Sequence, residues 1–222
     1  MDKNLTVMSL GGSLIIPGEK IDVRFLRSFR KLILEQVKVG RRLVIVSGGG
    51  RLARHYQQAA RSLARLRRED VDLLGIYATR INAALLRTIF LDYAHPKIIR
   101  DPRRKIEFRE PICLAAGWKP GFSSDHDTVL IAKNLGAKKL VNLTNVDFVL
   151  DKEGRPKKRI GWADYRCLIP REFSPGLSVP FGPIASRLAQ KMEMEVAVIN
   201  GRKLREVRRY LAGRDFAGTV IA

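Results

Sequence analysis

The sequence predicts an α/β fold: a three-layer sandwich in which a mainly parallel central sheet is covered by helices on both faces. Short apolar runs rich in β-branched residues alternate along the chain with amphipathic stretches, and glycines directly follow several of the runs. The alternation continues from end to end without an internal repeat or a linker-like segment. We therefore expect residues 1–222 to form a single domain.

In the first half of the chain, strands are expected over residues 5–10 and 43–46. A continuous β-branched run such as residues 43–46 is typical of a parallel strand that is covered on both faces. A helix is expected over residues 21–39, because Leu26, Phe29, Ile33 and Val37 fall on one face at helical spacing. Two further helices are expected over residues 52–66 and 73–91.

The second half of the chain continues the same alternation. Strands are expected near residues 97–99 and 111–114, and Ser124 opens the next helix. A strand over residues 139–144 leads to a polar turn at residues 151–156, which predicts the tip of a hairpin. The remaining elements are a helix over 183–194, a strand over 196–199, a helix over 204–211 and a strand over 219–221.

The charge of the chain predicts anionic partners. Forty-two Lys and Arg residues against 22 Asp and Glu residues give a net charge of +20. The basic clusters at residues 103–105, 157–159 and 202–209 predict weak, sequence-independent binding of nucleic acid through counterion release. Aromatic residues are not interleaved with these clusters, as stacking platforms for single-stranded RNA require, so a dedicated RNA-binding function is only an open alternative.

The cellular setting is expected to be the cytoplasm. No run of about 18 apolar residues predicts a membrane span, and residues 1–4 lack the apolar core of a secretion signal. Cys113 and Cys167 are too few and too far apart for a disulfide framework, so we interpret them as reduced thiols. We expect no membrane partner.

Two glycine-rich loops follow neighbouring strands and predict a phosphate site. Residues 11–13 (Gly-Gly-Ser) end the first strand, and residues 48–50 (Gly-Gly-Gly) end the second and open a helix. Ligands of parallel sheets bind where strands end, and glycine lets backbone N–H groups approach an anion closely. Arg54 follows one helical turn later and would add a guanidinium group to the site. Neither loop matches the Walker A or the G-x-G-x-x-G pattern.

The segment around residues 120–127 carries a second group of polar residues. Ser124 and Asp127 have the spacing of a capping box for the helix that follows. Ser123 and Asp125 exceed what capping needs, which favours contact with a ligand. His126 is expected on the helix surface.

The order of these motifs resembles the amino acid kinase family, and within it the uridylate kinase branch, most closely its archaeal type. The resemblance covers nearly the whole chain and is carried by residues 10–13, 48–54, 72–83, 117–125 and 144–147. It implies an amino acid kinase-like fold and transfer of the γ-phosphoryl group of ATP to UMP, giving ADP and UDP. It also implies Mg²⁺ as cofactor, a role in pyrimidine biosynthesis and a homohexamer.

The resemblance further implies roles for individual residues. Arg54 and Arg187 are the implied catalytic residues, and Lys191 shares a helix face with Arg187. No residue is assigned as a metal ligand. The implied UMP-binding residues are Gly49, Asp72, Gly117, Gly121, Phe122, Ser123, Ser124 and Asp125, with Asp72 on the ribose hydroxyls. The implied ATP-binding residues are Gly11, Gly12, Ser13, Gly50, Thr144, Asn145 and Leu150.

The departures from the family pattern cluster on the ATP side. Ser9 replaces a widespread lysine, Phe148 and Leu150 replace a glycine and a tyrosine, and Gly182 replaces an aspartate. Arg187 stands where the family often has a lysine, which keeps the charge but changes its geometry. These departures leave two alternatives open: a nucleotide-binding regulator with weakened or lost catalysis, and a kinase for a related small phosphate such as isopentenyl phosphate.

Overall fold

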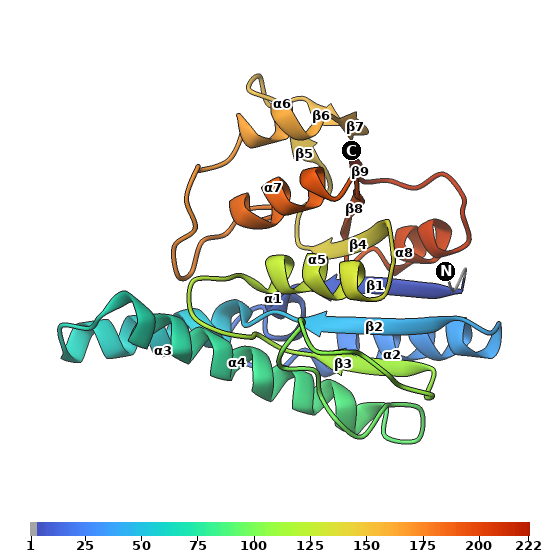
Figure 1. The fold of residues 1–222 in the computed structure, drawn as a ribbon, viewed down its shortest axis with the longest axis horizontal. Helices are drawn as coiled ribbons and strands as arrows, with labels where there is room; N and C mark the ends of the chain where they lie inside the picture. Colours follow the sequence, from blue (N-terminus) through green and yellow to red (C-terminus); the bar gives the residue numbers. More distant parts are fainter. Residues whose placement is uncertain (1–3) are drawn as a thin grey trace.

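The computed structural model describes residues 4–222, in which a seven-stranded sheet lies between two layers of helices (Figure 1). The sheet has the order β3-β2-β1-β4-β8-β9-β7. The strands from β3 to β8 are parallel, and β9 runs antiparallel to β8, so the predicted fold class is confirmed. The strands are β1 (Leu5–Leu10), β2 (Arg42–Ser47), β3 (Ile112–Ala115), β4 (Lys139–Thr144), β7 (Arg159–Ile160), β8 (Glu195–Asn200) and β9 (Thr219–Ile221).

The two faces of the sheet bury two separate apolar clusters. Helices α2 (Val23–Lys38), α4 (Arg68–Ile89) and α8 (Leu204–Leu211) cover one face. Helices α5 (Ser124–Asn134), α6 (Trp162–Arg166) and α7 (Pro183–Lys191) cover the other. Within β2, Leu43 and Ile45 join the first cluster and Val44 joins the second, so the strand is buried on both faces as its β-branched run predicts.

Helices α3 (Gly50–Leu63) and α4 pack along each other and extend beyond the carboxyl ends of β1 and β2 (Figure 1). Helix α3 begins at Gly50, shortly after β2 ends, so its N-terminus lies at the sheet edge where parallel-sheet proteins bind ligands. A short helical turn, α1 (Gly12–Ile15), follows β1 at the same edge. The overhang and this turn form the frame of the site.

Most predicted elements are present, with shifted ends. The strand expected near residues 97–99 is wrong: this segment lies at the sheet edge and meets β3 at a single isolated bridge, between Ile99 and Ala115, which is too little pairing for a strand. The helix expected over 183–194 ends at Lys191, because Glu193 adopts a left-handed conformation with φ of 52°. The expected hairpin is confirmed as β5 (Val149–Leu150) paired antiparallel with β6 (Pro156–Lys157), whereas α1, α6 and β7 were not expected.

Two other expectations concern the state of the cysteines and the absence of a membrane span. Both Cys113 and Cys167 are free thiols, and burial raises the pKa of the Cys113 thiol to about 12. Across residues 4–222, no helix combines the length and the apolar character needed to cross a bilayer. Residues 1–3, on which part of the expectation about a secretion signal depends, lie outside the described residues.

Candidate active site

The two predicted glycine loops meet at the carboxyl ends of β1 and β2. The Gly48 N–H group donates to the Leu10 carbonyl oxygen at 2.9 Å, which ties the end of one strand to the other. A Cβ atom on Gly12 would stand 2.4 Å from the Gly48 oxygen, and one on Gly50 would stand 2.2 Å from the Gly12 carbonyl carbon. The loops therefore interlock backbone against backbone, a contact that only glycine allows.

Arg54 brings a positive charge to these loops, as predicted. It lies one turn into α3 and lines the pocket that the loops enclose, where its Nη2 donates to the Ser13 hydroxyl at 3.1 Å. Burial and the neighbouring Arg51 both lower the pKa of Arg54, with burial the larger cause. Arginine remains protonated despite such shifts. The pocket thus combines glycine N–H groups, a helix N-terminus and a guanidinium group, a set suited to phosphate.

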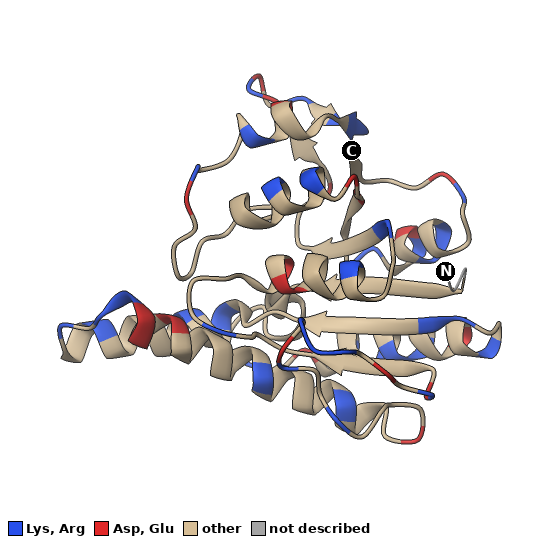
Figure 2. Ribbon diagram, in the orientation of Figure 1, with Lys and Arg blue, Asp and Glu red and all other residues tan. Residues whose placement is uncertain are grey.

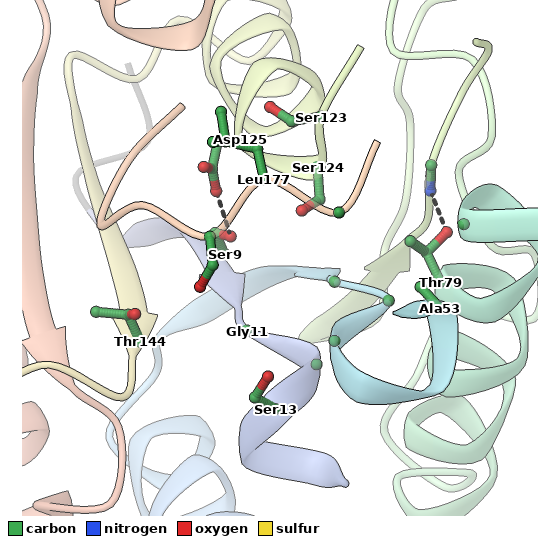
Figure 3. A pocket seen from close by; sticks show the side chains of 18 of the residues that line it. Ser9, Gly11, Ser13, Ala53, Thr79, Ser123, Ser124, Asp125, Thr144 and Leu177 are labelled. Atoms are coloured by element: carbon green, nitrogen blue, oxygen red, sulfur yellow. Dashed lines mark hydrogen bonds between the residues drawn. The ribbon is translucent and has the colours of Figure 1, made fainter. Parts of the chain in front are cut away.

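Helix α4 holds the opposite wall of the pocket through three buried polar residues on one face. The Asp72 carboxylate accepts from the Gly121 N–H group at 2.5 Å, and burial raises the pKa of Asp72. The Thr79 hydroxyl accepts from the Gly117 N–H group at 2.7 Å (Figure 3). The Asn82 side chain donates to the Gly48 carbonyl oxygen at 2.9 Å. One helix therefore positions both the second glycine loop and the segment that begins at Gly117.

The segment before α5 differs in detail from its prediction. The expected capping box of Ser124 and Asp127 is wrong: Ser123 is the N-cap, and its hydroxyl accepts from the His126 N–H group at 3.3 Å. Asp127 is buried and instead accepts from the Trp118 N–H group at 3.0 Å. His126, expected on the surface, is only 7% exposed and stacks on Phe122 with ring centroids 4.3 Å apart. This packing holds Phe122 at the pocket wall.

Asp125 projects toward Ser9 on β1 (Figure 3). Its carboxylate accepts from the Ser9 hydroxyl at 3.3 Å and from the Gly182 N–H group at 2.9 Å. Asp125 is partly buried, and it lines the pocket. This burial, strengthened by the charge of Asp127, raises the pKa of Asp125 to about 6. Across residues 4–222, no group of three or more His, Cys, Asp and Glu residues is arranged to hold a metal ion.

Replacing Asp125 with asparagine is expected to stabilise the protein at pH 8. The raised pKa means that ionised Asp125 opposes folding above pH 6, and that this cost fades as the pH falls toward the ordinary value of 3.8. A shift of this size corresponds to at most about 3 kcal/mol. Urea unfolding at pH 8 and at pH 4, without divalent cations, measures the difference. Equal stability of both proteins at pH 8 would contradict the expectation.

The pocket gathers most of the residues that the sequence singled out (Figure 3). Three of the implied binding and catalytic residues lie elsewhere, and so does Lys191, which is exposed at the end of α7. Gly121 does not line the pocket, but its N–H group donates to the Asp72 carboxylate, which does. Leu150 is half exposed on β5. Arg187 lines a separate cavity beside Arg166, and its Nη1 donates to the Arg171 carbonyl oxygen at 2.9 Å. The predicted residues in the pocket are Gly11, Gly12, Ser13, Gly49, Gly50, Arg54, Asp72, Gly117, Phe122, Ser123, Ser124, Asp125, Thr144 and Asn145.

The structure adds residues that sequence reasoning missed. The segment of residues 173–180 contributes to the lining of the pocket, and Leu177 is one of its lining residues (Figure 3). Asn142 donates to the Pro180 carbonyl oxygen at 2.5 Å and so ties this segment to β4. Gln57 on α3 lines the wall together with Thr79. No motif marks the segment, whereas Thr79 stands within the recognised stretch 72–83.

Three comparisons with known proteins identify the family to which this fold and site belong. A family model described as "Amino acid kinase family" matches residues 4–200. The uridylate kinase of Hyperthermus butylicus is 32% identical over 99% of both chains, and that of Thermoplasma volcanium is 34% identical over 97% of this chain and 96% of its own.

Solved structures show the same architecture. The uridylate kinase of Archaeoglobus fulgidus superimposes with a TM-score of 0.80 at 27% identity, covering 99% of this chain and all of its own. The UMP kinase of Bacillus anthracis, at 19% identity over 98% of this chain and 95% of its own, has a TM-score of 0.74 and supports the fold alone. With the family match across most of its length and the interlocked glycine loops at the strand ends, the chain belongs to the amino acid kinase family.

Proposed function

We propose that the protein is a UMP kinase that transfers the γ-phosphoryl group of ATP to UMP, giving ADP and UDP. The observation that carries the proposal is the meeting of both glycine loops with Arg54 in one pocket. Relatives that are 32% and 34% identical over nearly their whole length are named uridylate kinases. We place this reaction in the cytoplasm, as a step of pyrimidine nucleotide biosynthesis.

The chemistry needs positioning and charge neutralisation more than a covalent intermediate. On the acceptor side, the Asp72 carboxylate would receive hydrogen bonds from the ribose of UMP, and Phe122 with its neighbours would surround the base. The phosphate of UMP would lie at residues 48–50, where Arg54 neutralises charge that develops during transfer. The helix dipole of α3 adds to this effect at its N-terminus.

On the donor side, we place the ATP phosphates at Gly12, Ser13 and Gly50, with Thr144 and Asn145 toward the nucleoside. Mg²⁺ usually binds through substrate phosphates and one or two carboxylates. The Asp125 carboxylate lines the pocket beside hydroxyl groups and fits this requirement. When bound, the metal would neutralise the phosphate oxygens, which Ser13 and the loop N–H groups would hold in line.

A nucleotide-binding regulator without catalysis is the second candidate. It is favoured by the position of Arg187 outside the pocket, because the donor side then lacks the second guanidinium group that the family resemblance implies. The test is to incubate the protein with Mg-ATP and UMP, CMP, AMP, GMP or isopentenyl phosphate and to measure ADP. Turnover with UMP, lost when Asp72 is replaced by alanine, would support the kinase. UMP binding without ADP release would identify the regulator, and turnover of isopentenyl phosphate alone would overturn both.

We also propose that the protein forms a homo-oligomer, with the hexamer of the family resemblance as the expected form. Leu73, Tyr77 and Ile81 repeat every four residues on α4 and are 38%, 60% and 62% exposed. An apolar stripe of this kind on a helix is typical of a surface that another chain covers. Light scattering of the native protein is expected to give a multiple of 25.1 kDa, reduced when Tyr77 and Ile81 are replaced by serine. A monomer at micromolar concentration would contradict this.

Weak nucleic-acid binding is the expected consequence of the +20 charge, which is spread over many elements (Figure 2). Locally, carboxylates neutralise part of it: Arg103 pairs with Asp101 at 3.2 Å and Lys105 with Glu107 at 2.5 Å. Aromatic residues are not interleaved with these clusters in the sequence, but the fold brings the Arg103 guanidinium to 4.3 Å from the Trp118 ring centroid.

Binding of RNA is therefore expected to weaken steeply with salt, while UMP binding changes much less. Reversing the charges of Arg103, Arg104 and Lys105 to glutamate is expected to reduce the slope of log K against log salt by roughly 2 to 3. Kinase activity with UMP serves as the control and is expected to persist. RNA affinity that survives high salt and depends on sequence would instead support a dedicated recognition function.

A further inference from the structure

A buried glutamine in the pocket wall has an unused hydrogen-bond acceptor. Gln57 on α3 is only 3% exposed, and its Nε2 donates to the Val71 carbonyl oxygen on α4 at 3.0 Å. Because a carbonyl oxygen only accepts, this bond fixes the orientation of the amide and directs Oε1 the other way. Within residues 4–222, Oε1 is enclosed and has no hydrogen-bond partner.

An enclosed acceptor without a partner is unusual, because most buried polar atoms are hydrogen-bonded and an unmade bond costs stability. Gln57 lines the same pocket as Asp72 and Arg54. A ligand that completes this site must present an O–H or N–H group to Oε1. Phosphate oxygens of a bound nucleotide are therefore unsuitable, whereas sugar hydroxyls fit.

The position of Gln57 along α3 agrees with a sugar contact. Gly50 begins the helix at the phosphate loop, Arg54 follows one turn later, and Gln57 lies about 10 Å from Gly50 at 1.5 Å per residue. Across the pocket wall, Val71, which Gln57 contacts, directly precedes Asp72. The Gln57 oxygen and the Asp72 carboxylate thus form a pair of acceptors farther from the glycine loops than Arg54.

We propose that Gln57 is a specificity-determining residue whose Oε1 accepts a hydrogen bond from a ribose hydroxyl of the acceptor nucleotide. Gln57 and Asp72 would then divide the two hydroxyls of the sugar between them, and the site would select ribonucleotides over deoxyribonucleotides. A site built to bond a hydroxyl rejects an analogue that lacks it, because its own polar atom is left unpaired. This inference rests on the proposed function.

The segment of residues 173–180 is the other neighbour of this oxygen. A Cβ atom on Gly176 would stand 3.5 Å from Oε1, so this part of the segment lies close beside it. The segment could supply an N–H group to Oε1 if it moved, which would make Gln57 a contact of the segment and not of the sugar. If Gln57 contacts the sugar, the effect of replacing it depends on which hydroxyls the nucleotide carries. If Gln57 contacts the segment, the effect is the same for all nucleotides.

The test compares UMP, 2′-deoxy-UMP and 3′-deoxy-UMP in calorimetric titrations of the wild type, Gln57→Met and Gln58→Met. Methionine keeps the length of the side chain but removes both amide functions, and the exposed Gln58 is the matched control. Gln57→Met is expected to weaken UMP binding roughly tenfold and to leave the binding of one deoxy analogue unchanged. Gln58→Met is expected to leave all three affinities unchanged.

Gln57→Glu separates the acceptor from the bond to Val71, because it keeps an oxygen acceptor and loses the amide donor. It is expected to retain the preference for UMP over the deoxy analogue, and it serves as the test if Gln57→Met does not fold. Equal weakening of all three ligands by Gln57→Met, or a wild type that binds all three equally, would overturn the inference and leave the proposed function standing. A wild type that does not bind UMP would overturn both.

Discussion

Replacing Arg54 with alanine is expected to lower kcat for UMP phosphorylation by roughly 100- to 1,000-fold, the usual loss when one preorganised charge or donor is removed from a transferring group. Arg54 lines the pocket and donates to Ser13, so its charge acts on both phosphate loops at once. No carboxylate within 4–222 forms an ion pair with it, so the guanidinium is available to substrate. Steady-state kinetics with varied UMP and ATP measure the effect.

The fold is expected to tolerate this change. Arg54 is only partly buried, so its loss should cost no more than about 1 kcal/mol, or a few degrees in Tm. Arg51, exposed and one turn earlier on the same helix, is the matched control, and Arg51→Ala is expected to retain most activity. A fall in Tm that accounts for the lost activity would show that Arg54 is structural.

Replacing Gly50 with alanine is expected to destabilise the protein by at least about 3 kcal/mol and to abolish activity. Gly50 has φ of 58°, and a Cβ atom there would stand 2.2 Å from the Gly12 carbonyl carbon and 2.4 Å from the Ser13 nitrogen. These neighbouring atoms belong to the backbone and cannot move aside as the end of a flexible side chain can. The loops at residues 11–13 and 48–50 would therefore have to move apart. Urea unfolding at neutral pH measures the loss.

Gly213 serves to separate the two causes of the destabilisation at Gly50, which are backbone strain at positive φ and the clash of the Cβ atom with the neighbouring loop. It has a similar φ of 68°, but nothing lies within 4 Å of the Cβ position, so Gly213→Ala is expected to cost only about 1 kcal/mol of backbone strain. The excess cost at Gly50 then measures the close approach of the loops. Equal destabilisation by both substitutions would show that the loops separate easily and that their interlocking is unimportant.

Runs of β-branched residues predicted the strands correctly where a strand is buried on both faces of the sheet. The run at 43–46 and the glycines after it place β2 and the start of α3, because alternating strands and helices admit few arrangements. The same logic predicted that residues 11–13 and 48–50 meet, since the ends of parallel strands share one edge. Where the pattern was short, as at residues 97–99, the prediction was wrong because pairing at a sheet edge depends on the partner strand.

The sequence by itself therefore determined the fold class, the two glycine loops at the strand ends and the position of Arg54, all of which follow from residues close together in the chain. Only the tertiary structure decided which distant residues complete the site. Gln57 enters the wall because α3 packs against α4, and Arg187 lies outside the pocket although the helix that carries it was predicted. Such placements depend on the packing of whole helices and on segments such as 173–180, for which neither periodicity nor spacing carries a signal.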